Sequence, residues 1–82
     1  MAKPRIGEKV KTPKGEGYVL SAYDWKDEIR TMSGDEAVLY AQDLRARYGA
    51  KWQEKFCRVC VGIGKGQKWF ESRDIEVIES RE

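Results

Sequence analysis

The sequence predicts an α+β fold, mainly β, in which about five strands form a small β-barrel and one helix is inserted near residues 35–48. Two observations predict it. Short segments of alternating apolar and polar residues are separated by turns rich in Gly and Pro, and one central segment changes to helical spacing. The 82 residues are expected to form a single domain with one small core. Residues 1–5 and 79–82 are expected to be mobile ends.

The N-terminal segment predicts two strands joined by a turn. We expect the strands over residues 9–12 and 17–23. Pro13 cannot donate a hydrogen bond to a strand ladder, so the first strand should end there. Gly15 and Gly17 allow the positive φ or the close backbone approach that such a return requires. The residues expected to anchor the two strands in the core are Val10 and Val19.

The next segment predicts a loop, a short strand and then the helix. Residues 24–28 are polar around one Trp and indicate a loop, and residues 29–32 indicate a short strand. Ser33 followed three residues later by Glu36 is typical of a capping box at a helix start. Gly49 is suited to the helix end. One helical stripe is formed by Ala37, Ala41, Leu44 and Tyr48.

The C-terminal third returns to strand patterns. A strand is predicted over residues 51–64, with Arg58 and Cys60 on the face opposite the core. Its alternating, inward-facing residues are expected to be Cys57, Val59, Val61 and Ile63. Since neighbouring strand residues face opposite ways, only one of Trp69 and Phe70 can lie in the core. The following elements are a hairpin turn at 64–67, a strand from 68, a 3₁₀ turn at 71–74 and a closing strand at 75–78.

Two parts of the chain together resemble SH3-like barrels of the KOW and CarD-like kind. Residues 6–10 followed by 12–19 resemble their opening, in which a Val after a Gly-acid start is paired with a Gly-x-Gly-x-Val return. Residues 65–70 and 74–78 resemble their distal hairpin and closing strand. Such barrels bind RNA, DNA, RNA polymerase, ribosomal components or peptides. The resemblance therefore implies a binding module and leaves its partner open.

The residue types argue against an enzyme, a metal site or a bound cofactor. The chain has no His, and its Ser residues have no evident base partner. Cys57 and Cys60 form a C-x-x-C pair within a predicted strand, where they would point to opposite faces about 10 Å apart at about 3.3 Å per residue. No secretory or membrane-spanning apolar run is evident, so we expect a cytoplasmic protein with no membrane association.

The charges are balanced overall but divided into blocks. The net charge is +2, yet residues 1–15 carry +4 and residues 45–70 carry +6, while residues 16–44 carry −5 and residues 71–82 carry −3. Two interpretations stay open. The basic blocks can merge into one patch that binds phosphate or another acidic partner, or segments of opposite sign can simply face each other.

Nine aromatic residues, three of them Trp, are many for so small a core. We predict a non-catalytic binding module, associated with nucleic acid or with transcription and translation, in which aromatic rings stack on bases and cations pair with phosphates. The candidate nucleic-acid-binding residues are Lys11, Lys14, Trp25, Lys51, Trp52, Lys55 and Arg58. The aromatic residues expected to be partly exposed are Tyr18, Tyr23, Trp25 and Trp52.

Two alternatives accompany this prediction. In the first, the chain is a protein–protein interaction module, with a peptide groove or self-association through the helix and the exposed aromatic residues. In the second, Trp25 and Trp52 have a structural role and pack the helix onto the barrel. Phosphate binding weakens steeply with salt, whereas an apolar peptide groove does not, so salt dependence separates the two functions. The sequence leaves the oligomeric state open.

Overall fold

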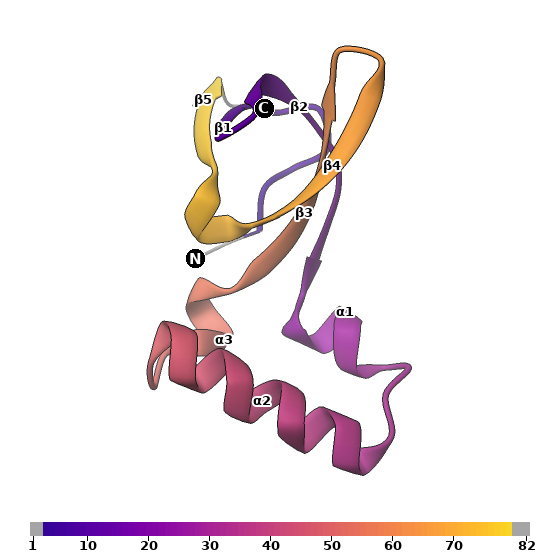
Figure 1. Cartoon of the computed structure of the whole chain (residues 1–82), viewed down its shortest axis with the longest axis vertical. Coiled ribbons are helices and arrows are strands. Elements are labelled where there is room, and N and C mark those ends of the chain that lie inside the picture. Colours follow the sequence, from indigo (N-terminus) through magenta and orange to yellow (C-terminus); the bar gives the residue numbers. More distant parts are fainter. Residues whose placement is uncertain (1–2, 80–82) are drawn as a thin grey trace.

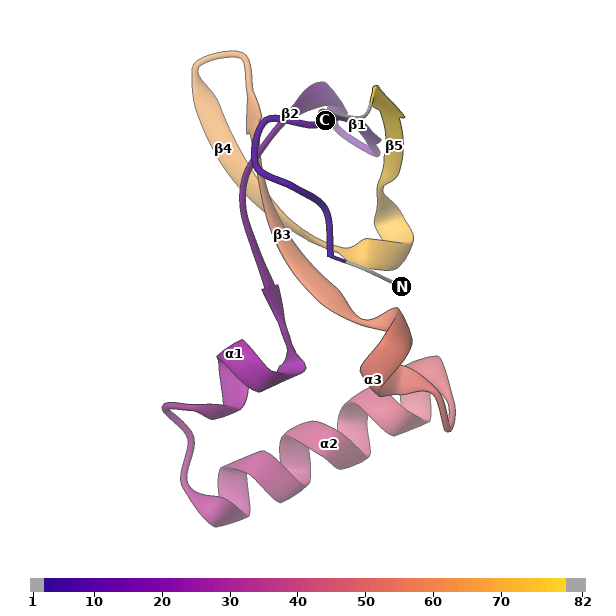
Figure 2. The ribbon, with the colours of Figure 1, turned by 180° about the vertical axis from the view of Figure 1, so that it is seen from behind.

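The computed structural model describes residues 3–79, which form a curled five-stranded antiparallel sheet with a helical insertion (Figure 1). The elements in chain order are β1 (Lys9–Thr12), β2 (Gly15–Asp24), α1 (Trp25–Ile29), α2 (Gly34–Tyr48), α3 (Trp52–Lys55), β3 (Cys57–Ile63), β4 (Gly66–Glu71), the 3₁₀ turn η1 (Ser72–Asp74) and β5 (Glu76–Glu79). The three helices lie beyond one end of the sheet, where the chain leaves β2 and returns into β3 (Figure 2).

The spatial order of the strands is β4-β3-β2-β1-β5. The predicted α+β class is confirmed, but the closed barrel is not, because β4 and β5 are the two edges and do not pair within the described residues. Of the ends expected to be mobile, 1–5 and 79–82, residues 1–2 and 80–82 lie outside the described residues.

The first hairpin has the predicted strands and turn, although β2 is longer than expected at both ends. Gly15 has φ of +118°, a conformation that favours Gly. Gly17 packs so closely on β3 that an added Cβ would collide with the carbonyl oxygen of Gly62. The two glycines therefore serve the two purposes that the sequence indicates.

Both predictions for residues 24–32 are wrong, because residues 25–29 form α1 and residues 30–32 turn toward α2. Asp24 caps α1 by accepting a hydrogen bond from the backbone N–H of Asp27 at 3.0 Å. The Asp27 carboxylate accepts one in return from the backbone N–H of Asp24, also at 3.0 Å. This reciprocal pair is a capping box with Asp in place of the usual Glu or Gln, so the helix start was hidden in a polar segment.

The helix over residues 35–48 is confirmed as α2, which begins one residue earlier. Ser33 Oγ accepts a hydrogen bond from the backbone N–H of Glu36 at 3.2 Å, and Glu36 Oε1 accepts one from the backbone N–H of Ser33 at 3.4 Å. Gly49, with φ of +88°, donates its N–H to the carbonyl oxygen of Arg45 at 2.8 Å. The capping residues thus set both ends of the helix.

The predicted strand over 51–64 is too long, because its first part forms the single turn α3 and the strand begins at Cys57. The segment Trp-Gln-Glu-Lys has neither the alternation nor the β-branched residues of a strand. The turn closes where the backbone N–H of Phe56 donates to the carbonyl oxygen of Trp52 at 2.9 Å.

The main core lies on the concave face of the sheet. Its buried residues are Val10, Val19, Cys57, Val59 and Val61. Partly buried Phe70 packs against this cluster, so Phe70 and not Trp69 faces the core. The predicted alternation of β3 is confirmed, and Cys60 lies on the opposite face, where it is also buried.

A second, smaller cluster joins the helical insertion to the sheet. Leu44 of α2 and Phe56 are each 1 % exposed. The rings of Tyr40 and Tyr48, two helical turns apart on α2, contact the Phe56 ring edge-on with centroid distances of 6.2 and 5.6 Å. Phe56 is therefore the apolar anchor between α2 and the start of β3.

Candidate nucleic-acid interface

Segments that carry cations of the two basic blocks lie along one side of the molecule, on either side of η1. Lys11 of β1 and Arg73 of η1 line the same surface pocket of about 320 Å³, which Asp74 and Glu76 also line. The hydroxyl of Ser72, next to Arg73, donates to the carbonyl oxygen of Lys55 at 2.7 Å. Lys51 lies one turn before Lys55, whose backbone N–H donates to the carbonyl oxygen of Lys51 at 3.2 Å. Figure 1 accordingly shows β1, η1 and α3 one above another along one side.

Lys14 extends this row at the β1–β2 turn, where its backbone N–H donates to Thr12 Oγ1 at 3.1 Å. We call the resulting set of five cations the basic edge: Lys11, Lys14, Lys51, Lys55 and Arg73. Four of them are predicted site residues. Arg73 was missed because it belongs to a block of net negative charge, and its place near the lysines follows from the tertiary structure, through the pocket shared with Lys11 and the hydrogen bond between Ser72 and Lys55.

The ion pairs decide between the two interpretations of the charge blocks, residue by residue. Four cations pair with acidic residues of other blocks: Lys3 with Asp27, Lys9 with Glu16, Arg58 with Glu28 and Arg47 with Glu71. In contrast, no ion pair within residues 3–79 involves the four lysines of the basic edge. Facing segments therefore neutralise part of the charge, including that of Arg73, which lies 3.8 Å from Glu71, whereas the four lysines form no ion pair within residues 3–79.

Arg58 lies apart from the basic edge, on the convex face of β3. Its Nε donates to Glu28 Oε2 at 2.9 Å, while Glu28 Oε1 accepts the Tyr40 hydroxyl at 2.7 Å. Burial and the hydrogen bond to Glu28 raise the pKa of Tyr40. Arg58 thus has a structural partner that links the sheet to α1 and α2.

Trp25 of α1 and Trp52 of α3 are half-buried and contact each other. Their ring centroids are 5.6 Å apart with an interplanar angle of 67°. The two rings therefore join two helices of the insertion, and each covers part of the other.

The exposed aromatic residues gather instead on the convex face of the sheet. We call this set the aromatic face: Tyr18, Leu20, Tyr23 and Trp69. Their exposed fractions are 54 %, 46 %, 42 % and 50 % respectively. Tyr23 of β2 and Trp69 of β4 meet across β3 with ring centroids 5.8 Å apart and an interplanar angle of 30°. Trp69 was not among the predicted exposed residues, whereas Tyr18 and Tyr23 were.

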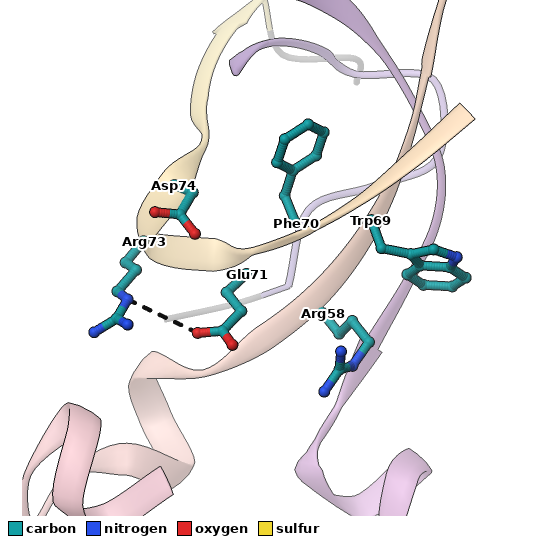
Figure 3. Close-up of a pocket in the computed structure, with 6 residues that line it drawn as sticks. All are labelled: Arg58, Trp69, Phe70, Glu71, Arg73 and Asp74. Carbon is teal, nitrogen blue, oxygen red and sulfur yellow. Dashed lines mark ion pairs between the residues drawn. The ribbon is translucent and has the colours of Figure 1, made fainter. Parts of the chain in front are cut away.

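A pocket of about 290 Å³ lies where the aromatic face meets the basic edge (Figure 3). It is lined by Arg58, Trp69, Phe70, Glu71, Arg73 and Asp74. Figure 3 shows Phe70 pointing away from Trp69, and Arg73 and Asp74 projecting from η1 beyond the end of β4. The pocket therefore connects Trp69 with Arg73 by a continuous surface.

Glu71, one of the two carboxylates that line this pocket, is held by neighbouring residues. It accepts hydrogen bonds from the Arg47 guanidinium at 2.5 Å and from the Tyr48 hydroxyl at 2.6 Å, and Arg73 Nε lies 3.8 Å away. Burial alone would raise the pKa of Glu71, but these hydrogen bonds outweigh burial and lower it. Burial and the hydrogen bond to Glu71 raise the pKa of Tyr48. Glu71 is therefore an ionised structural anchor.

In the part of the chain that the structure describes, no group of side chains is assembled for metal binding or for thiol chemistry. Residues 3–79 contain no cluster of three or more His, Cys, Asp or Glu side chains that could hold a metal ion. Cys57 and Cys60 are buried and not bonded to each other, and burial raises the pKa of Cys57. No helix among these residues has the length and apolar character needed to cross a bilayer.

Comparisons with known proteins add no family to this geometry. No family model matches the chain, and no curated protein or solved structure is significantly similar to it. The likeness to SH3-like barrels of the KOW and CarD-like kind stays a prediction from sequence, and the function has to be argued from the side chains themselves.

Proposed function

We propose that the chain is a non-catalytic nucleic-acid-binding module that holds a phosphate backbone along the basic edge. The observation that carries this proposal is the meeting of Lys11, Arg73 and Lys55 through a shared pocket and the Ser72 hydrogen bond. These contacts support a row of cations drawn from separate blocks of the chain. Cations that neutralise phosphates release condensed counterions, which favours binding without any need for sequence readout.

Among residues 3–79 the four lysines form no ion pair, which supports the same proposal. Each would otherwise have to break an internal contact before it could bind a phosphate. From the resemblance to KOW and CarD-like barrels, we further propose that the module is associated with transcription or translation.

The test is the binding of labelled oligonucleotides, measured by fluorescence anisotropy over a range of salt concentrations. We expect the logarithm of the binding constant to fall linearly with the logarithm of the salt concentration. The double variant Lys14→Glu/Lys55→Glu should abolish binding. Lys26→Glu/Lys65→Glu is the matched control, because it changes the net charge equally at exposed positions outside the basic edge. Equal loss in both double variants would show that net charge, and not the basic edge, drives binding.

A protein–protein interaction module is the second candidate function, and one observation on α2 favours it. Val38 and Leu39 are adjacent and are 56 % and 65 % exposed. A surface that binds phosphates does not require such a pair, whereas a protein partner would bury it. Binding of a protein partner, or self-association, that persists at high salt and is lost in Val38→Asp/Leu39→Asp would favour this candidate over the first.

A further inference from the structure

We infer that the aromatic face stacks the bases of a single strand whose phosphates follow the basic edge, so the module prefers single-stranded nucleic acid to duplex. The inference rests on the proposed function and adds to it the class of nucleic acid and a second binding surface. The argument starts from Tyr23 and Trp69, whose rings meet on the sheet surface while about half of each side chain stays exposed.

The sheet holds these two rings in place from below. In the strand register, Cys60 of β3 is the partner of Trp69, and Arg58 is the partner of Tyr23. Cys60 is 3 % exposed although it lies on the convex face, which fits a side chain beneath rings that meet across β3. Arg58 is tied to Glu28 at 2.9 Å, so the neighbouring positions on the strand are fixed as well. Preformed rings of this kind lose little conformational freedom on binding.

Exposed rings favour unpaired bases for a simple reason. The faces of a base in a duplex are covered by its neighbours, whereas a base of a single strand can turn out and stack on an aromatic side chain. Tyr18 and Leu20 continue the same apolar surface along β2, where Leu20 covers Gly62 of β3. The surface is therefore long enough to offer contacts beyond one ring.

Because the aromatic face is continuous with the basic edge, nucleic acid is the occupant that fits this face. Trp69 and Arg73 line one pocket, so a strand that leaves the lysines at Arg73 reaches Trp69 without crossing other elements (Figure 3). Two carboxylates, Glu71 and Asp74, also line this pocket, and the Arg47 guanidinium pairs with Glu71. Phosphates on one side and bases on the other match the two kinds of surface that single-strand binding proteins combine.

Tryptophan fluorescence tests the inference directly. Oligo(dT) and a duplex of equal length are titrated at low salt, and anisotropy of labelled oligonucleotides gives the affinities. We expect tighter binding of oligo(dT), together with quenching that disappears in Trp69→Phe and persists in Trp25→Phe. Trp69→Ala should weaken oligo(dT) binding about tenfold and leave duplex binding unchanged. Trp69→Phe should retain most of the affinity, because a ring still stacks.

Tyr23→Ala provides a second variant in case Trp69→Ala does not fold, and it should also weaken oligo(dT) binding selectively. Unchanged oligo(dT) affinity in both folded variants, or equal losses for single strand and duplex, would overturn the inference. If the inference failed in this way but Lys14→Glu/Lys55→Glu still abolished oligonucleotide binding, the proposed function would stand and only the role of the aromatic face would be rejected. Failure of the unmodified protein to bind any oligonucleotide at low salt would overturn both and favour a protein occupant.

Discussion

The sheet and the helical insertion are stabilised in different ways. Core valines such as Val10 and Val59 are fully buried, and the strands are paired along most of their length. In α2, all 15 residues of which the structure describes, only Leu44 is buried. The insertion is attached instead by the Phe56 ring and by two carboxylates, Glu28 and Glu71, each of which accepts a Tyr hydroxyl and an Arg.

This contrast has a physical consequence. Apolar burial in the sheet does not depend on the ionisation of any side chain. Attachment of α2 depends on directional hydrogen bonds to Glu28 and Glu71, and those to the ionised Glu71 are stronger than neutral ones but require the charge. The insertion should therefore respond to polar substitutions and to acid that leave the sheet intact.

Phe56→Ala should have the largest effect, because it removes the ring that both tyrosines of α2 contact. We expect a loss of about 3–5 kcal/mol in the free energy of unfolding, measured by urea denaturation. Hydrogen exchange should show α2 losing more protection than β1 and β2. Equal loss of protection throughout the chain would contradict the distinction between the two regions.

Glu71→Gln should have the next largest effect and should also change the pH dependence of stability. The folded-state pKa of Glu71 lies below its ordinary value of 4.5. Its carboxylate therefore contributes stability that is fully present above pH 4.5 and is lost as the pH falls through the folded pKa. We expect Glu71→Gln to cost about 1–2 kcal/mol at neutral pH.

The acid dependence gives this prediction its control. In urea denaturation at a series of pH values, the unmodified protein and Glu71→Gln should approach the same stability in acid, because both then lack the ionised group. A constant difference at every pH would mean that the charge of Glu71 contributes nothing. The same series, followed by hydrogen exchange, should show α2 opening before the sheet.

Tyr48→Phe should have the smallest effect of the three. It keeps the ring on Phe56 but removes the hydroxyl that donates to Glu71 at 2.6 Å. We expect a loss of about 1 kcal/mol in the free energy of unfolding. The control is Tyr18→Phe, at a ring that is 54 % exposed, which should change stability by less than about 0.5 kcal/mol. Similar losses in both variants would show that the hydrogen bond from Tyr48 to Glu71 is not the cause of the effect.

Elements defined by local chemistry were predictable from sequence. Pro13 marks the end of β1, and Ser33 with Glu36 marks the start of α2. The α1 helix was missed because its capping box uses Asp27 within a segment whose composition is typical of a loop. Whether β4 and β5 close a barrel depends on pairing between distant strands, which local patterns do not determine.

The candidate site was predictable only in part for a similar reason. The blocks of charge identify Lys11, Lys14, Lys51 and Lys55, because charge is read directly from composition. Arg73 joins them through the contact of η1 with α3, and Trp69 joins Tyr23 through the register of three strands. Both relationships are tertiary. The pairing of Arg58 with Glu28, 30 residues apart in the chain, is tertiary as well.

An NMR titration of the folded chain with short oligonucleotides at low salt tests the central claim, that the basic edge binds nucleic acid, most directly. Chemical-shift changes should cluster at the five residues of the basic edge: Lys11, Lys14, Lys51, Lys55 and Arg73. They should weaken as salt is added, and signals from the exposed face of α2 around Val38 and Leu39 should stay unchanged. Shifts confined to α2, or no shifts along the basic edge, would contradict the account.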